Sequence, residues 1–100
     1  MSRLFHGDLI IQILFHYGWT QKDLAEVLGR PTQLVNEIIN DKKEITRETA
    51  MQLEAATGIE AGYLLGVQDR WRMSKIMKDP ATQRKLSEIT TRASSLLRKR

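Results

Sequence analysis

Hydroxyl and carboxamide side chains recur at helical spacing near the middle of this 100-residue sequence. Together with one carboxylate, Glu37, they form a set of five that a helix would place on one face. The set is Thr32, Gln33, Asn36, Glu37 and Asn40. Carboxamides can form two hydrogen bonds to the edge of an adenine, which suits Gln33 or Asn36. Thr32 could contact a thymine methyl group or a phosphate, and Glu37 could accept from cytosine or repel incorrect sites. The pattern therefore predicts contacts with the bases of double-stranded DNA.

Three further side chains are suited to the DNA backbone. Gln21 lies at the start of a preceding helix, where free backbone N–H groups favour a phosphate. Lys42 and Lys43 lie in the polar segment that follows the base-contacting face. Any one of these positions is equally compatible with a solvated helix face, so the prediction rests on the set.

Two short helices joined by a tight turn would position this set. Thr20 is expected to cap the first helix, with Asp23 as its capping-box partner. Gly29 would end it, because glycine adopts positive φ without strain. Pro31 suits the first turn of the second helix. Apolar residues give both helices a buried face, and these are Leu24, Ala25, Leu28, Val35, Ile38 and Ile39. The stretch from 20 to 40 is thus a helix-turn-helix motif.

The remainder of the chain is also predicted to be helical. Residues 9–17 form a first helix, entered at Gly7 and Asp8, and Ile45 returns to the core. Thr46 caps a helix that ends at Gly58. Another helix begins near Glu60, is bent or ended by Gly66, and resumes over residues 67–78 with Trp71 and Ile76 inward; a last helix covers residues 81–98. The fold class is all-α, with residues 1–78 as the DNA-binding domain and residues 79–100 as a basic helical extension.

Composition argues against several classes of protein. There are no cysteines, and the two histidines, His6 and His16, are ten residues apart without a metal-ligand pattern. We therefore expect no metal, no cofactor and two surface or half-buried imidazoles. No nucleophile lies beside a base and no glycine loop could cradle a phosphate, so we expect no catalytic residue and no enzyme activity. No apolar run approaches the roughly 18 residues of a membrane span, and a cytoplasmic protein is the simplest expectation.

The formal charge of +4 is unevenly distributed. Residues 1–69 hold six Lys and Arg against ten Asp and Glu, a net −4. Residues 70–100 hold ten against two, a net +8. The expected DNA-binding domain is therefore acidic, and long-range attraction to DNA must come from the last third of the chain.

The sequence resembles the lambda-repressor-like (XRE) helix-turn-helix family, and its HigA-type antitoxin branch in particular. The resemblance covers about residues 6–75 and rests on Gly18-Trp19-Thr20-Gln21, Leu24-Ala25, Leu28-Gly29, Ile38-Ile39-Asn40, Ile45-Thr46, Glu48-Thr49-Ala50, Leu53 and Tyr63-Leu64-Leu65. It implies a five-helix domain that binds a palindromic operator as a homodimer and represses transcription, often of its own operon. For the antitoxin branch it also implies neutralisation of a toxin that cleaves mRNA. The residues that it places on DNA are Gln21, Thr32, Gln33, Asn36, Glu37 and Asn40.

Three residues depart from the family pattern. Arg30 occupies a turn position that is usually apolar, so its side chain should snorkel or point outward. Asp41 replaces a common glycine and should place an anion beside the DNA. Glu37 replaces a commonly basic or polar residue. These departures concern DNA affinity and operator sequence more than the fold.

The last helix admits three interpretations. It can be a solvated helix, it can pack its apolar stripe against a second subunit or a partner, or its Arg98-Lys99-Arg100 end can contact phosphates. The stripe consists of Leu86, Ile89, Ala93, Leu96 and Leu97. A stand-alone regulator, or an interaction module that does not bind DNA, remains the alternative to an antitoxin.

Overall fold

The computed structural model describes residues 5–99, and these form six α-helices and no strand. The helices are α1 (His6–Tyr17), α2 (Gln21–Leu28), α3 (Thr32–Ile39), α4 (Arg47–Thr57), α5 (Ala61–Met77) and α6 (Pro80–Arg98). The predicted all-α class is confirmed. No helix in this part of the chain is long and apolar enough to cross a lipid bilayer. Arg100, which belongs to the basic end considered for phosphate contact, lies outside the described residues.

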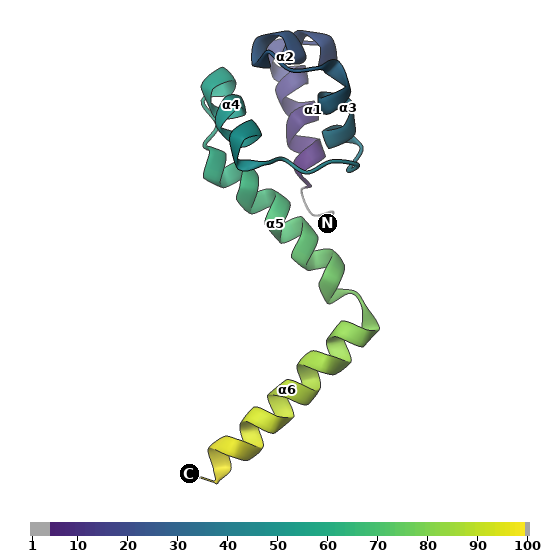
Figure 1. Ribbon diagram of the computed structural model, residues 1–100, viewed down its shortest axis with the longest axis vertical. Coiled ribbons are helices and arrows are strands. Elements are labelled where there is room, and N and C mark those ends of the chain that lie inside the picture. The colour runs from purple at the N-terminus through teal and green to yellow at the C-terminus, as the bar shows by residue number, and fades with distance from the viewer. Residues whose placement is uncertain (1–4, 100) are drawn as a thin grey trace.

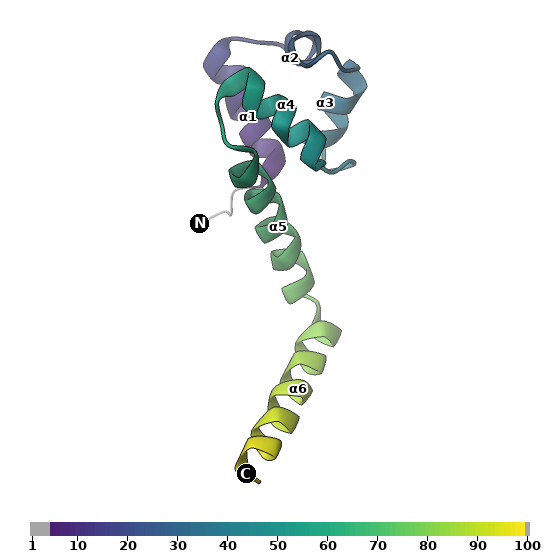
Figure 2. The same ribbon diagram turned by 60° about the vertical axis from the view of Figure 1, so that its left-hand side comes forward.

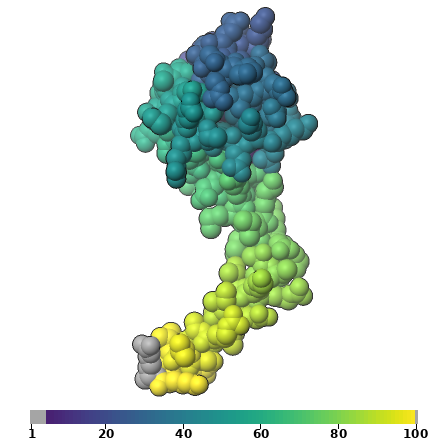
Figure 3. Space-filling model, viewed as in Figure 1, coloured from purple at the N-terminus to yellow at the C-terminus, as the bar shows by residue number. Residues whose placement is uncertain are grey.

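The helices form a compact head with a long projection (Figure 1). Helix α5 packs against α4 and α1 at the lower side of the head and then runs away from it. Helix α6 continues beyond it at an angle, as the view in Figure 2 also shows. The result is a molecule of 60 × 24 × 24 Å in which α6 stands apart from the core (Figure 3).

One apolar core holds the head together. It takes side chains from α1 to α5 and from the loop before α4, and its members are Leu9, Ile10, Ile13, Leu24, Ala25, Leu34, Val35, Ile38, Ile45, Ala50, Leu53, Leu64 and Val67. The expected return of Ile45 to the core is confirmed, with 2% of the residue exposed. The buried side chain of Leu34 was not predicted, and it widens the apolar face of α3.

Local hydrogen bonds begin and end the two helices of the motif largely as predicted. The Thr20 hydroxyl accepts from the Asp23 N–H at 3.0 Å, and the Asp23 carboxylate accepts from the Thr20 N–H at 2.9 Å. Gly29 then adopts a φ of +66°, which reverses the chain between α2 and α3. Pro31 is the residue just before α3 and does not lie in its first turn.

Helix α1 begins earlier than the sequence suggested. Phe5 precedes the helix, and Gly7 and Asp8 lie within its first turn. The Asp8 carboxylate accepts from the Phe5 N–H at 3.3 Å, which satisfies one of the free donors at this helix end. A Cβ atom on Gly7 would lie 2.6 Å from the Ile39 carbonyl oxygen, so glycine permits the close approach of α1 to α3.

Two expectations for α5 were wrong. Gly66 neither ends nor divides α5, because Leu64 and Val67 are both buried and hold the helix in the core on either side of it. Ile76 was expected to point inward, but it is 56% exposed, whereas Ser74 two residues earlier on α5 is buried. Helix α6 starts at Pro80, capped by the Asp79 carboxylate, and none of its residues is buried.

Candidate nucleic-acid interface

Helix α3 separates its residues into a buried and an exposed face. Leu34, Val35 and Ile38 lie in the core. On the other side, Glu37 is half-buried and the remaining predicted base-contacting residues are exposed, namely Thr32, Gln33, Asn36 and Asn40. The structure thus places the predicted set on one accessible helical surface.

Hydrogen bonds connect the predicted residues of α2 and α3. The Asn36 amide donates to the Gln21 side-chain oxygen at 3.2 Å, so the helices are bridged at their exposed surface. The Asn40 amide donates to the Asn36 carbonyl oxygen at 2.9 Å, one turn back along α3. These bonds limit the rotation of the carboxamides and leave the Asn36 side-chain oxygen available as an acceptor.

The two lysines that follow α3 are exposed, and their backbone is tightly held. The N–H groups of Lys42 and Lys43 both donate to the Glu37 carbonyl oxygen, at 2.8 and 3.2 Å. Their ammonium groups are therefore presented from a fixed turn at the C-terminal end of α3. This position suits contact with phosphates on either side of a groove that holds the helix.

Arg30 neither snorkels nor points outward. Its guanidinium group donates to the Thr49 hydroxyl at 3.3 Å and to the Gln52 side-chain oxygen at 3.0 Å. The turn between α2 and α3 is thereby attached to α4. The departure from an apolar residue at this position is accommodated by polar partners on a neighbouring helix.

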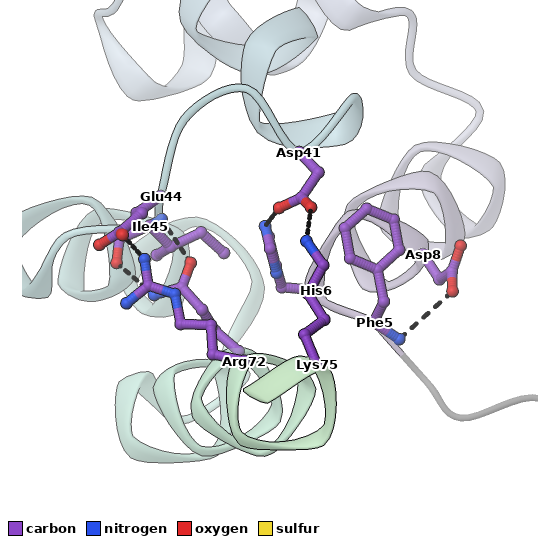
Figure 4. Close-up of polar contacts among 9 residues, drawn as sticks. Phe5, His6, Asp8, Asp41, Glu44, Ile45, Arg72 and Lys75 are labelled. Atoms are coloured by element: carbon purple, nitrogen blue, oxygen red, sulfur yellow. Dashed lines mark hydrogen bonds and ion pairs between the residues drawn. The ribbon is translucent and has the colours of Figure 1, made fainter. Parts of the chain in front are cut away.

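Asp41 was expected to place an anion beside the DNA, but its carboxylate is paired with other side chains of the protein. Its backbone adopts a φ of +57°, the left-handed region that explains why a glycine would also suit this position. Its carboxylate accepts from the Lys75 ammonium at 2.8 Å and lies 3.7 Å from the His6 imidazole (Figure 4). The hydrogen bond from Lys75 lowers the pKa of Asp41, although burial opposes that shift.

His6 was expected at the surface or half-buried, and it is 1% exposed. Helix α1 begins at this residue, and the ring packs edge-on against Phe5 with centroids 4.7 Å apart. Burial lowers the pKa of His6; the nearby Asp41 and Asp8 raise it, whereas Arg72 and Lys75 lower it further. His16 is exposed, as expected.

The buried imidazole predicts loss of stability in mild acid. Because the pKa of His6 is lower in the folded protein than its ordinary 6.5, the unfolded chain binds a proton first as the pH falls. The free energy of unfolding should therefore decrease between about pH 7 and 5.5, by at most about 1.4 kcal/mol per pH unit. The lowered pKa of Asp41 acts only at more acidic pH. Thermal melts across this range give the dependence of the melting temperature on pH, which should be weaker in His6→Gln than in the His16→Gln control. The same dependence in both variants would contradict the assignment.

Sequence analysis missed the residues that hold the loop after α3. Gln68, Arg72 and Lys75 lie on one face of α5 and bind Ile45, Glu44 and Asp41 of that loop. Their spacing of four and three residues was visible as a polar stripe in the sequence. Their partners, which lie more than 20 residues earlier in the chain, were not.

The family model described as Helix-turn-helix matches residues 12–64, which is more than half of the chain. The chain belongs to this helix-turn-helix family. The predicted resemblance to XRE-type proteins is thereby confirmed, and the match includes both α2 and α3. Among curated proteins, none matches the sequence.

Several solved structures share the fold over most of this chain. A hypothetical protein from E. coli has a TM-score of 0.81 at 24% identity, covering 96% of this chain and 99% of that one. An addiction module antidote protein of a HigA family from Coxiella burnetii has a TM-score of 0.76 at 26% identity, covering 88% and 95%. The Pseudomonas aeruginosa antitoxin HigA with the higBA promoter has a TM-score of 0.75 at 16% identity, covering 87% and 94%. The first and third of these show the fold alone.

Proposed function

We propose that this protein is a sequence-specific DNA-binding repressor. The observation that carries the proposal is the exposed polar face of α3, presented by a family fold whose core holds the opposite face. An α-helix fits the roughly 12 Å wide major groove of B-DNA, with its N-terminal residues nearest the bases. Gln33 and Asn36 then contact adenine, with Thr32, Glu37 and Asn40 beside them.

Gln21, Lys42 and Lys43 bind the phosphates that flank this groove. Gln21 lies at the first turn of α2 and shares a hydrogen bond with Asn36, so the two contacts are set together. The lysines lie at the other end of α3. Phosphate contacts from α2 and from the turn after α3 fix the orientation of the helix, while the side chains of α3 supply specificity.

A homodimer would present two copies of α3 to a palindromic operator. Helix α5 supports this proposal, because a groove of about 600 Å³ along it is lined by Tyr63, Val67, Arg70, Trp71, Met73, Ser74 and Met77. Helix α6 adds the exposed apolar residues Leu86, Ile89, Leu96 and Leu97. We propose that a second copy covers these surfaces, with residues 79–100 acting as an extension of a DNA-binding domain formed by residues 1–78.

We further propose that the repressor is a HigA-type antitoxin that autoregulates its operon and neutralises an mRNA-cleaving toxin. The similarity to the Coxiella burnetii antidote protein supports this assignment. Co-expression with the product of the adjacent reading frame tests it: the frame alone should arrest growth, and this protein should relieve the arrest by forming a complex. A repressor that binds its operator but has no toxic neighbour would be a stand-alone regulator.

Footprinting on the DNA upstream of its own coding sequence tests the repressor function. We expect a protected segment with two half-sites related by a dyad and separated by about one helical turn, roughly 34 Å, or a multiple of it. Uniform protection of the whole fragment at every concentration would show nonspecific coating and would refute sequence-specific repression.

Deleting residues 81–100 should reduce nonspecific DNA affinity and its dependence on salt. This segment holds six Lys and Arg against one Glu, whereas residues 1–69 carry a net −4. A protein that neutralises fewer phosphates releases fewer counterions, so the slope of log affinity against log salt should become shallower by roughly one for each phosphate that is no longer neutralised. Titrations of random duplex at several salt concentrations measure this slope, and an unchanged slope would show that the segment takes no part in DNA binding.

A further inference from the structure

The loop that follows α3 is fastened along one face of α5. Gln68, Arg72 and Lys75 follow one another at spacings of four and three residues, so they form a single stripe on this helix. Gln68 binds Ile45. Arg72 and Lys75 bind Glu44 and Asp41, as Figure 4 shows. The loop is therefore positioned by α5 as well as by the helix that it leaves.

The inner attachment is buried and uses the backbone. The Gln68 carboxamide accepts from the Ile45 N–H at 2.6 Å and donates to the Ile45 carbonyl oxygen at 2.9 Å. Next along α5, the Arg72 guanidinium forms an ion pair with the Glu44 carboxylate. These two attachments hold the end of the loop that is closest to the core.

The outer attachment is the pair formed by Asp41 and Lys75. The Lys75 ammonium lies 5.3 Å from the centre of the Trp71 ring, and it donates to the Asp41 carboxylate at 2.8 Å. The other oxygen of that carboxylate lies 3.7 Å from His6 Nε2 of α1. One carboxylate at the end of α3 thus contacts both α1 and α5.

We propose that Asp41 and Lys75 are positioning residues for DNA binding, which orient the turn so that Lys42 and Lys43 face the phosphates. This inference rests on the proposed function. Lys42 follows Asp41 directly, so the attachment of Asp41 to α5 restrains the start of the turn that the Glu37 carbonyl holds from α3. The Lys75 ammonium also neutralises a carboxylate that would otherwise repel the phosphates nearby.

The ion pair between Lys75 and Asp41 is too exposed to serve mainly in holding the fold together. The side chains of Lys75 and Asp41 are 54% and 34% exposed, and an exposed ion pair contributes little to folding stability. The fold is held instead by the buried Gln68 attachment and the core. Loss of the outer pair should therefore affect DNA binding more than it affects unfolding.

A double-mutant cycle on the full chain tests the proposal. Lys75→Met keeps an unbranched side chain of similar length without the charge. It should weaken operator binding about threefold to fivefold relative to Lys78→Met, which removes the same charge from the end of α5. In an Asp41→Asn background, the same Lys75→Met change should cost no more than Lys78→Met. Equal effects of Lys75→Met in both backgrounds would show that Lys75 acts on DNA independently of Asp41 and would overturn the proposal.

The free protein provides a second readout that does not depend on DNA. In an NMR titration of His6, Lys75→Met should raise the pKa of the imidazole by removing a neighbouring cation, and Asp41→Asn should lower it by removing the anion. Lys75→Arg should restore both operator affinity and the His6 titration. If the titration behaves as expected but neither the original chain nor any variant prefers the operator, the proposed function fails, while the contacts among His6, Asp41 and Lys75 are supported. If operator binding is specific but the His6 pKa is the same in all variants, the positioning pair is refuted.

Discussion

Replacing Gln33 and Asn36 together by alanine should reduce the preference for the operator over random duplex DNA by about 100-fold, since each well-formed amide contact with a base contributes roughly 1–3 kcal/mol of discrimination. Both side chains are exposed on α3 and contribute nothing to the core. Their loss should therefore change the free energy of unfolding by no more than about 0.5 kcal/mol. Competition titrations with specific and random duplexes measure the preference, and thermal melts measure stability.

Gln12→Ala is the matched control for this experiment. It removes an exposed carboxamide from α1, on an element that does not form part of the candidate interface. The control should retain full operator preference. If the double variant also retained it, α3 would not be the recognition helix, and a role in protein interaction without DNA binding would be favoured.

Gln68→Leu should destabilise the fold by about 2–4 kcal/mol, because it leaves the N–H and carbonyl groups of Ile45 buried without partners. For a domain of this size, the melting temperature should fall by at least about 10 °C. Gln12→Leu makes the same change from glutamine to leucine at an exposed position and should have little effect on stability. A loss of less than about 1 kcal/mol in Gln68→Leu would mean that another group satisfies the Ile45 backbone.

The features that sequence analysis predicted correctly depend on neighbouring residues. The Thr20 and Asp23 capping box spans a single helical turn, and the positive φ of Gly29 follows from a helix that must reverse. The apolar face of α3 was predicted from the spacing of Val35 and Ile38. Such short-range patterns are sufficient to define the motif and the family fold.

The features that sequence analysis did not predict depend on residues far apart in the chain. His6 is buried because α1 begins where Phe5 packs against Trp71 of α5, with ring centroids 5.2 Å apart. Asp41 was expected as an anion facing DNA, and only the approach of α5 shows its pairing with Lys75. Gly66 was expected to interrupt α5 because its helix propensity is poor, but the buried neighbours on both sides outweigh that cost of about 1 kcal/mol.

The candidate interface was predicted as a set of residues, and the structure adds their relation to one another. Gln21 and Asn36 were assigned separate roles, yet their side chains share a hydrogen bond. Lys42 and Lys43 were placed in a polar loop, and that loop proves to be a tight turn attached to α5. Neither relation could be obtained from helical periodicity, which fixes a face but not its neighbours.

The most direct test of sequence-specific binding is a competition assay with the full chain and a labelled duplex from its own upstream region. At about 150 mM salt, where long-range charge effects are screened beyond roughly 8 Å, unlabelled duplex of the same sequence should displace the label at a concentration at least about 1,000-fold lower than a scrambled duplex. Equal displacement by both duplexes would contradict the proposal that the face of α3 recognises bases.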